Sequence, residues 1–163
     1  MIELRDITWD NFWDIVKNLN PKESQKDFLP SNAIFMAQAW LNLKAGDPHA
    51  CFAIYHENTL IGFTKIVFVA KGEKPFCFTE DTYYLDAMMI DEKYQGKGYG
   101  KAALTQILAF MKSRPWGEAG SIKLSCYDIN PTAAKLYENF GFVKTNNFID
   151  KGRGLRLYEL SQK

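Results

Sequence analysis

Three glycines fall within five positions of this sequence, at Gly96, Gly98 and Gly100. They follow residues 83–90, which are apolar and predict a strand, and they precede residues 99–111, whose apolar positions have helical spacing. Because glycine has no Cβ atom, the backbone can turn tightly here and present several N–H groups at the positive end of a helix. The segment therefore predicts a strand, a turn and a helix whose N-terminus can bind a diphosphate.

Two familiar phosphate-binding loops do not fit this segment. A P-loop needs four residues between its glycines and Lys-Ser or Lys-Thr directly after the last one, and a dinucleotide-binding loop needs a longer glycine spacing. Lys97 and Lys101 add positive charge that favours a phosphate site. The structural alternative is a flexible turn between a strand and a helix, and the glycines alone do not decide between the two.

A length of 163 residues with 47% hydrophobic residues predicts one domain over residues 1–163. Hydrophobic periodicity predicts six to seven strands and about four helices. The predicted order is β-α-α-β-β-β-α-β-α-β-β, and the strand-helix-strand step over residues 83–127 implies a parallel crossover. We therefore predict an α/β (α+β) protein with a mixed, mostly antiparallel twisted sheet. The predicted strands lie at 1–7, 51–55, 60–69, 83–90, 122–127, 142–148 and 155–160, and the predicted helices begin near residues 8–10, 31–32, 99 and 130.

The composition argues against several partners and locations. Lys plus Arg number 20 and Asp plus Glu number 19, so the net charge of +1 creates no field that would attract nucleic acid or an anionic membrane. Cys51, Cys77 and Cys126 are far apart and match neither a disulfide framework nor a zinc site. Glu3 and Asp6 lie where a signal peptide would have basic residues, and no apolar stretch has membrane-spanning length, so we predict a soluble cytoplasmic protein. We also expect no bound metal.

Other conspicuous residues have plain structural interpretations. Trp9, Trp13 and Trp40 lie on predicted helix faces and are expected in the core or in a pocket wall. His49 and His56 lie near a turn, with no Cys or carboxylate at metal-ligand spacing. We therefore expect neither catalysis nor metal binding from the two histidines.

The segment Tyr84–Gly100 resembles the acetyl-CoA motif of the GNAT family of N-acetyltransferases. The core of that motif is Gln or Arg, two residues, Gly, one residue, and then Gly or Ala, and Gln95, Gly98 and Gly100 fill these positions. The resemblance implies the GNAT fold and acetyl-CoA as the co-substrate. In that family the strand before the loop pairs with the pantetheine arm, and the loop amides hold the pyrophosphate. The implied contacts in this sequence are Met88, Met89, Ile90, Gln95, Gly96, Lys97, Gly98, Tyr99, Gly100 and Lys101.

A second segment, Asp128–Phe142, resembles the second motif of the same family, in which Asn130 and Tyr137 occupy the functional positions. Asn130 is then expected to contact the cofactor, although an Asn before Pro131 is also an ordinary helix N-cap. Two motifs on the expected elements are more specific than either motif alone. The resemblance extends at least from Cys51 to the C-terminus.

Acetylation of an amine needs a base, an acid and stabilisation of an oxyanion, because an alkylamine is protonated at pH 7. Asp86 lies in an otherwise apolar strand, where similar polyamine acetyltransferases place a carboxylate base. It could take the proton directly or through water, or attract a cation by charge alone. The structural alternative is a carboxylate that pairs with a neighbouring cation or faces solvent. Tyr137 is the implied acid for the departing thiolate, and packing in the core is its structural alternative. The resemblance alone suggests that a backbone N–H near Met88 stabilises the oxyanion.

The segments 84–98 and 31–40 are similar to bacterial spermine/spermidine acetyltransferases, which makes a polyamine the leading substrate. The loop acids Glu73, Glu80 and Asp81 could also attract a polycation. The pocket is expected to be lined from residues 34–40 and 73–86, with substrate contacts from Phe35, Trp40, Tyr84 and Asp86.

The acceptor is not fixed by this pattern, because one fold supports many functions. Another small amine, such as an aminoglycoside, an amino acid or a protein N-terminus, is one alternative. A non-catalytic acyl-CoA-binding sensor is another. The aromatic content leaves room for a homodimer interface.

Overall fold

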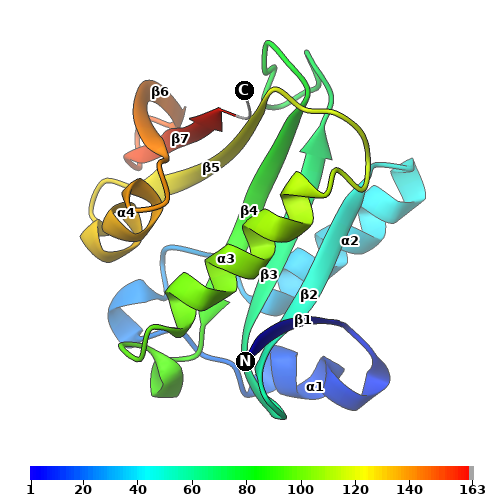
Figure 1. Ribbon diagram of the computed structural model, residues 1–163, viewed down its shortest axis with the longest axis vertical. Coiled ribbons are helices and arrows are strands. Elements are labelled where there is room, and N and C mark those ends of the chain that lie inside the picture. Colours follow the sequence, from blue (N-terminus) through cyan, green and yellow to red (C-terminus); the bar gives the residue numbers. More distant parts are fainter. Residues whose placement is uncertain (162–163) are drawn as a thin grey trace. The chain divides into compact units, whose positions relative to one another are not determined.

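The computed structural model describes residues 1–161, and its helices and strands follow the predicted order (Figure 1). The strands are β1 (Ile2–Asp6), β2 (His49–His56), β3 (Thr59–Val69), β4 (Thr82–Ile90), β5 (Ser121–Tyr127), β6 (Val143–Asp150) and β7 (Leu155–Ser161). The helices are α1 (Trp9–Lys17), α2 (Asn32–Ala45), α3 (Tyr99–Lys112) and α4 (Pro131–Glu138), with short 3-10 helices η1 (Glu23–Gln25) and η2 (Glu92–Tyr94).

The seven strands belong to one mixed sheet, in the order β1-β2-β3-β4-β5-β7-β6. β1 pairs antiparallel with β2, and β7 pairs antiparallel with both β5 and β6. β4 and β5 are parallel, with Thr82 opposite Ser121 and Leu85 opposite Leu124, as expected of strands joined through a helix. The predicted fold class and the predicted parallel pair are therefore confirmed.

The chain forms two compact units that share β3 and β4. Unit 1 comprises residues 1–66 and 87–113, and unit 2 comprises residues 67–86 and the described residues from Arg114 onward. The two shared strands thus pass from one unit to the other, β3 after Ile66 and β4 after Asp86. The single domain over residues 1–163 stays a prediction.

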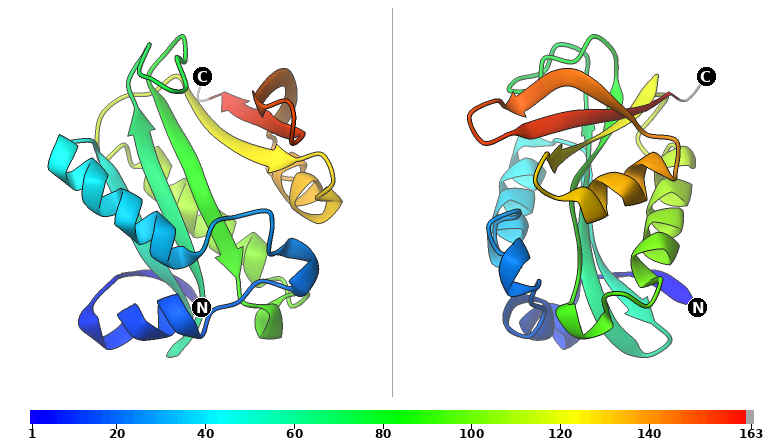
Figure 2. Two further views of the ribbon diagram at one scale, coloured as in Figure 1. Left: turned by 180° about the vertical axis from the view of Figure 1, so that it is seen from behind. Right: turned by 90° about the vertical axis from the view of Figure 1, so that its left-hand side faces the viewer.

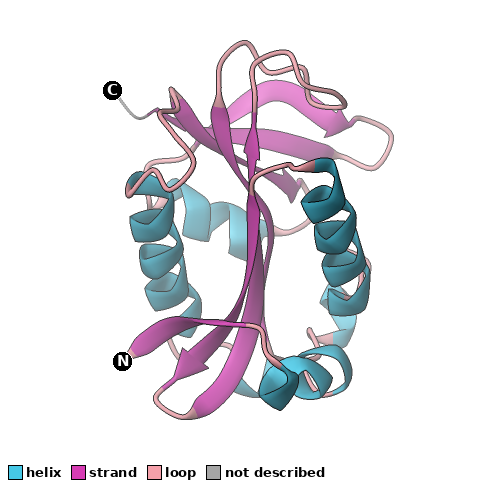
Figure 3. Cartoon of the chain, turned by 90° about the vertical axis from the view of Figure 1, so that its right-hand side faces the viewer, coloured by secondary structure: helices cyan, strands magenta, loops and turns pink. Residues whose placement is uncertain are grey.

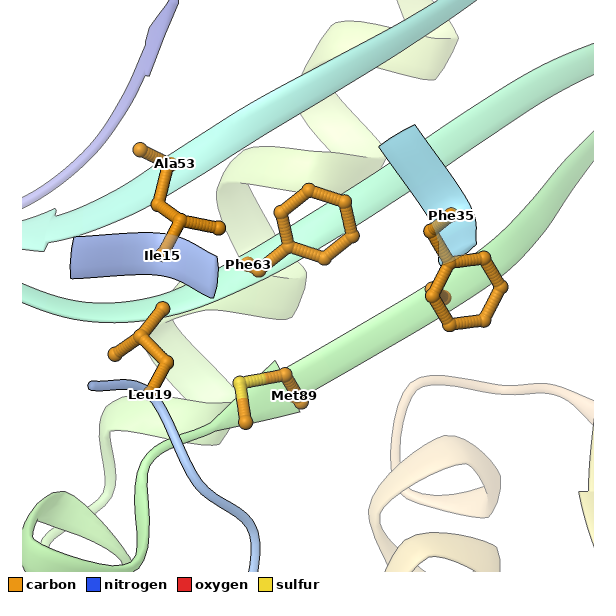
Figure 4. Close-up of a cluster of buried hydrophobic side chains, with 7 residues drawn as sticks. Ile15, Leu19, Phe35, Ala53, Phe63 and Met89 are labelled. Atoms are coloured by element: carbon orange, nitrogen blue, oxygen red, sulfur yellow. The ribbon is translucent and has the colours of Figure 1, made fainter. Parts of the chain in front are cut away.

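One core of unit 1 lies between the sheet and the helices α1 and α2, and Figure 4 shows its side chains. The rings of Phe35 from α2 and Phe63 from β3 stack with their centroids 6.3 Å apart. Burial of each large apolar side chain here stabilises the fold by about 1.5–3 kcal/mol. The buried members of the cluster are Ile15, Leu19, Phe35, Ala53, Phe63, Ala87 and Met89.

The helix α3 covers the opposite face of the sheet in unit 1, so that helices flank these strands on both sides (Figure 3). Ala103 of α3 packs in one cluster with Ile54, Ile61 and Ile90 from three strands. This packing fixes the start of α3 close to the end of β4. All residues predicted for the apolar face of α3 are buried: Ala103, Leu104, Ile107, Leu108 and Met111.

Local capping sets the ends of the first two helices. Thr8 caps α1 in a capping box, in which the backbone N–H of Thr8 donates to Oδ1 of Asn11 at 2.9 Å. Helix α2 ends at Gly46, whose φ of 82° is left-handed. The start of α1 lies where the sequence predicts it.

The tryptophans of α1 and α2 are exposed, and the prediction of a core position is wrong. Trp9, Trp13 and Trp40 are 80%, 55% and 59% exposed. The ammonium groups of Lys17 and Lys44 lie over the rings of Trp13 and Trp40, at 4.4 and 5.4 Å from the ring centroids. Helical spacing places these residues on a face of the helix but does not tell what covers that face.

Unit 2 is built around the antiparallel ladder of β5 and β7, with α4 and the β6–β7 hairpin following β5 in the chain (Figure 2). The ladder runs from Ser121 opposite Ser161 to Tyr127 opposite Leu155. The apolar core of this unit includes the aromatic ring of Tyr84 from β4. Its members are Val69, Phe78, Tyr84 and Leu157, with Val67 and Phe76 packed against them.

A buried lysine lies next to this core. Lys123 is 5% exposed, and its ammonium donates to Ser121 Oγ at 2.8 Å and to Glu159 Oε2 at 3.0 Å. The carboxylate of Glu80 lies 3.6 Å from the same nitrogen, and a Cβ atom at Gly120 would collide with Glu80. The charge of Lys123 is thus compensated, as a buried cation requires.

Candidate active site

The turn between β4 and α3 contains two glycines in the left-handed region. Gly96 has a φ of 77° and Gly98 a φ of 81°, which residues with a Cβ atom rarely adopt. A Cβ atom at either position would meet no other described atom within 4 Å, so the restriction is conformational and does not come from crowding. Gly98 is the N-cap of α3, and no side chain in the described part of the chain caps this helix. The N–H groups of its first turn are therefore available to a ligand.

Gln95 holds this turn in place. Its Nε2 donates to the carbonyl oxygen of Ile90 and to Oε1 of Gln25, both at 2.8 Å. The first bond ties the turn to the end of β4, and the second ties it to a residue 70 positions earlier in the chain. Because both N–H groups of the side chain are used, Gln95 shapes the turn and leaves anion binding to the main chain.

Asp91 organises the same turn, although it was not predicted. Asp91 is 2% exposed, and its carboxylate accepts from the backbone N–H of Asn20 at 2.9 Å and of Lys93 at 3.0 Å. Its own N–H donates to the carbonyl oxygen of Ile61 at 2.8 Å. An Asp that follows a strand and precedes a polar turn is a recognisable signal for such bonds, so the sequence could have revealed this residue.

Positive charge surrounds the start of α3. Lys97 and Lys101 are exposed, and the ammonium of Lys97 donates to the carbonyl oxygen of Lys93 at 3.0 Å. The ring of Tyr99 lies 4.6 Å from that of His56 and so supports the first turn of the helix. Unpaired N–H groups, the helix dipole and two lysines together suit a diphosphate.

Two predicted contacts at the end of β4 can act only through the main chain. The side chains of Met89 and Ile90 are each 8% exposed, and they belong to the two cores of unit 1. Met88 is half-buried. Unit 1 thus brings Met88–Ile90 and Gln95–Lys101 together at one end of α3.

Asn130 is the N-cap of α4. Its Oδ1 accepts from the backbone N–H of Ala133 at 3.2 Å, and Pro131 occupies the first helical position. The carbonyl oxygen of Asn130 accepts a weak bond from Cys126 Sγ at 3.8 Å. The capping alternative therefore describes its side chain, and its contact with a cofactor stays a prediction.

Tyr137 lies on α4, is half-buried and packs against the buried rings of Phe142 and Tyr158. Its ring centroid is 6.0 Å from that of Phe142 and 6.5 Å from that of Tyr158. Burial raises the pKa of Tyr137 above its usual range, and the nearby Cys126 and Tyr84 add to this shift. The phenol is therefore protonated at neutral pH, as a general acid must be.

Asp128 anchors the segment that leads into α4. Its carboxylate accepts two bonds from Arg156, from Nε and Nη2, each at 3.1 Å. Lys144 Nζ lies 2.6 Å from Oδ1. The hydrogen bonds from Arg156 and Lys144 lower the pKa of Asp128 to about 2. An ionised Asp128 thus connects the start of the α4 segment to β6 and β7 within unit 2.

Tyr84 and Asp86 lie two residues apart on β4, in unit 2. Tyr84 is 3% exposed and Asp86 is half-buried. The hydroxyl of Tyr84 donates to Ser125 Oγ at 2.9 Å. Ser125 was not predicted, and no sequence signal could have paired two residues 41 positions apart.

The acidic residues of the loop before β4 are used within the fold. The carboxylate of Glu73 accepts from the backbone N–H of Ala70 at 2.9 Å, and that of Asp81 accepts from the N–H of Lys71 at 2.8 Å. Glu80 is paired with buried Lys123, as described above. These residues therefore shape the loop, and their negative charge is partly compensated.

The two predicted substrate contacts on α2 differ in exposure. Phe35 is 4% exposed and belongs to the core, with the ammonium of Lys65 5.7 Å from its ring centroid. Trp40 is exposed and already carries the cation of Lys44 on its ring. Their contact with a substrate stays a prediction.

The described residues contain no group of three or more His, Cys, Asp or Glu side chains that could hold a metal ion. Within residues 1–161, none of the helices has the length and apolar character that a membrane crossing requires.

The sequence matches known acetyltransferases over nearly its full length. The model of the acetyltransferase (GNAT) family matches residues 9–142. Spermine/spermidine N(1)-acetyltransferase of Bacillus subtilis (strain 168) is 26% identical over 163 residues, which cover 98% of this chain and 99% of the relative.

Solved structures share the fold at lower identity. Spermidine N-acetyltransferase from Vibrio cholerae, in complex with CoA and spermine, has a TM-score of 0.69 at 18% identity and covers 97% of this chain and 92% of its own. The NatC complex bound to Gag peptide and CoA has a TM-score of 0.70 at 16% identity and covers 99% of both chains. A neighbour bound to spermine and a neighbour bound to a peptide thus have nearly the same TM-score, so the fold alone does not select an acceptor.

The ion pairs of Asp128 predict a pH-dependent stability. Because its pKa falls from 3.8 to about 2 on folding, its contribution is fully present above pH 3.8 and is lost as the pH falls from there towards 2. Asp128→Asn should therefore lower the free energy of unfolding at pH 7, and the difference from wild type should shrink below about pH 4. Urea titrations at several pH values measure this difference in the free energy of unfolding. Glu138→Gln, at an exposed position, is the control. A constant difference down to pH 3 would contradict the assignment.

Proposed function

The chain belongs to the acetyltransferase (GNAT) family, and from this premise we propose that it acetylates a primary amine of a polyamine such as spermidine or spermine. It is an N-acetyltransferase that depends on acetyl-CoA. The similarity to spermine/spermidine N(1)-acetyltransferase over both full lengths is the observation that supports a polyamine over other amines. In this proposal the amine attacks directly, within a ternary complex.

The start of α3 would hold the diphosphate of acetyl-CoA. Gly96 and Gly98 set the turn, the first N–H groups of the helix donate to the phosphate oxygens, and Lys97 and Lys101 add charge. The main chain of Met88–Ile90 would pair with the pantetheine arm, and Asn130 would contact the cofactor while it caps α4. When bound, acetyl-CoA supplies an acetyl group that is activated as a thioester.

Asp86 would prepare the amine for attack. An alkylammonium loses its proton near pH 10, as lysine does, so the nitrogen is not a nucleophile at neutral pH. The half-buried carboxylate of Asp86 attracts this cation and accepts its proton, directly or through water. The freed lone pair then forms the new bond between nitrogen and carbon.

Tyr137 would complete the transfer. As the bond between carbon and sulfur breaks, Tyr137 donates its phenolic proton to the departing thiolate, and a backbone N–H near Met88 stabilises the carbonyl oxygen during the attack. Burial keeps the hydroxyl protonated until that step. The attacking nitrogen loses its second proton after the attack, and this proton restores the phenol of Tyr137, while Asp86 releases the first proton to solvent. The products are the acetylated amine, free CoA and one proton.

The proposed partner is a small-molecule amine, and the proposed location is the cytoplasm. A net charge of +1 creates no field that would attract nucleic acid or an anionic membrane, so neither is expected as a partner. The exposed Trp9 and Trp40 leave apolar surface for a homodimer interface.

A panel of acceptors tests the substrate class. Release of CoA from acetyl-CoA should be fastest with spermidine or spermine, with kcat/KM at least about tenfold above that for lysine, an aminoglycoside or a peptide with a free N-terminus. The carboxylate of Asp86 on β4 would attract a multiply charged acceptor more strongly than lysine or a peptide. The preference over an aminoglycoside, which is also multiply charged, rests on the similarity to spermine/spermidine N(1)-acetyltransferase. A higher kcat/KM for one of the other amines would redirect the assignment to it. Tight binding of acetyl-CoA without turnover of any amine would favour a sensor.

Loss of the Tyr137 hydroxyl should slow the chemical step. We expect Tyr137→Phe to lower kcat by about 100-fold or more and to change the Kd of acetyl-CoA much less, because its proton is needed only as the thiolate leaves. Tyr158→Phe, which removes a hydroxyl from the same aromatic cluster, is the matched control. Equal kcat values for the two variants would mean that Tyr137 contributes only to packing and not to proton transfer.

A further inference from the structure

Tyr84 is fixed at both ends of its side chain. Its ring centroid lies 4.6 Å from that of Phe76 and 6.1 Å from that of Phe78. At the other end its hydroxyl donates to Ser125 Oγ at 2.9 Å. With 3% of the residue exposed, neither the ring nor the hydroxyl is free to rotate away. The position of the Tyr84 oxygen is therefore set by the fold.

The register of the parallel strands explains why Ser125 is the partner. Tyr84 of β4 lies opposite Lys123 of β5, so Ser125 is the diagonal neighbour two residues further along β5. Lys123 does not compete for the hydroxyl, because its ammonium donates to Ser121 and Glu159. The hydrogen bond follows from the strand pairing within unit 2.

Asp86 lies close to this hydroxyl. It is two residues from Tyr84 in the same strand, a spacing that places two side chains on one face. The charge of Asp86 contributes to the raised pKa of Tyr84, which agrees with this proximity, although burial is the larger cause. A phenol oxygen and a carboxylate thus occupy neighbouring positions on β4.

The direction of the hydrogen bond decides whether the Tyr84 hydroxyl can donate to a substrate or accept from it. A phenol has one proton and two lone pairs, and the proton of Tyr84 is given to Ser125. The oxygen of Tyr84 is left as an acceptor. An alkylammonium group carries only donors and needs several acceptors when it leaves water.

We propose that Ser125 is a positioning residue for the amine substrate: by taking the proton of Tyr84, it turns the Tyr84 oxygen into a second acceptor, beside Asp86, for the N–H groups of an alkylammonium. The inference rests on the proposed function and deepens it, because it names the groups that recognise the protonated amine. A neutral amine or an amide would gain less from this pair of acceptors.

Removal of the Ser125 hydroxyl tests the inference. In Ser125→Ala the proton of Tyr84 is free to point towards the substrate, so KM for spermidine and its calorimetric Kd in the presence of CoA should rise about tenfold, more than kcat falls. Ser125→Thr keeps a hydroxyl and should restore both values towards wild type. Ser113→Ala, which removes an exposed hydroxyl at the C-cap of α3, is the control and should leave the affinity for spermidine unchanged.

Tyr84→Phe supplies the second arm of the experiment. If the two residues act as one unit, the Tyr84→Phe/Ser125→Ala double variant should bind spermidine no more weakly than Tyr84→Phe alone. Additive losses would overturn the inference, as would a loss of thermal stability in Ser125→Ala at unchanged KM. A fall in kcat at unchanged KM would also overturn the inference, because Tyr84 would then act in the chemical step and not in binding of the amine.

The two proposals can fail separately. If the wild-type protein acetylates no amine, the proposed function is wrong. If it acetylates spermidine and Ser125→Ala keeps the wild-type affinity for spermidine, only the role of Ser125 is wrong.

Discussion

An uncapped helix N-terminus is the constraint on which the rest of this structure depends. The α3 helix begins directly after Gly98, whose left-handed backbone replaces the Ser, Thr, Asp or Asn that usually caps a helix. Its first N–H groups thus lack a side-chain acceptor from the described residues, and an anion can satisfy them. Gln95 and Asp91 fix the turn with their side chains, so the free amides are held in one geometry before any ligand arrives.

The two units contribute different chemistry. Unit 1 provides fixed amides, a helix dipole and two lysines, which suit binding of an anion. Unit 2 provides hydroxyl groups that burial keeps protonated, at Tyr84 and Tyr137, together with the carboxylate of Asp86. In the proposed function, binding of the diphosphate and proton transfer would therefore depend on separate sets of residues, and a substitution in one set is expected to affect one step more than the other.

The sequence predicted what local patterns encode. The apolar face of α3, the glycine turn before it and the N-cap at Asn130 depend on near neighbours, and each lies where expected. It did not predict Ser125 or the ion pairs of Asp128, because their partners are distant in the chain and are brought close only by strand register. The exposed tryptophans were misplaced for a related reason: periodicity identifies an apolar face but not the element that covers it.

Amide chemical shifts during a titration with CoA test the central claim most directly. The account predicts that the largest changes in a heteronuclear spectrum fall on the backbone N–H groups of Tyr99, Gly100 and Lys101, because these would donate to the diphosphate. The same titration with Gly98→Ala, in which the left-handed turn is strained, should require more CoA for the same change. Binding of CoA that leaves these amides unshifted, or no binding at all, would contradict the account.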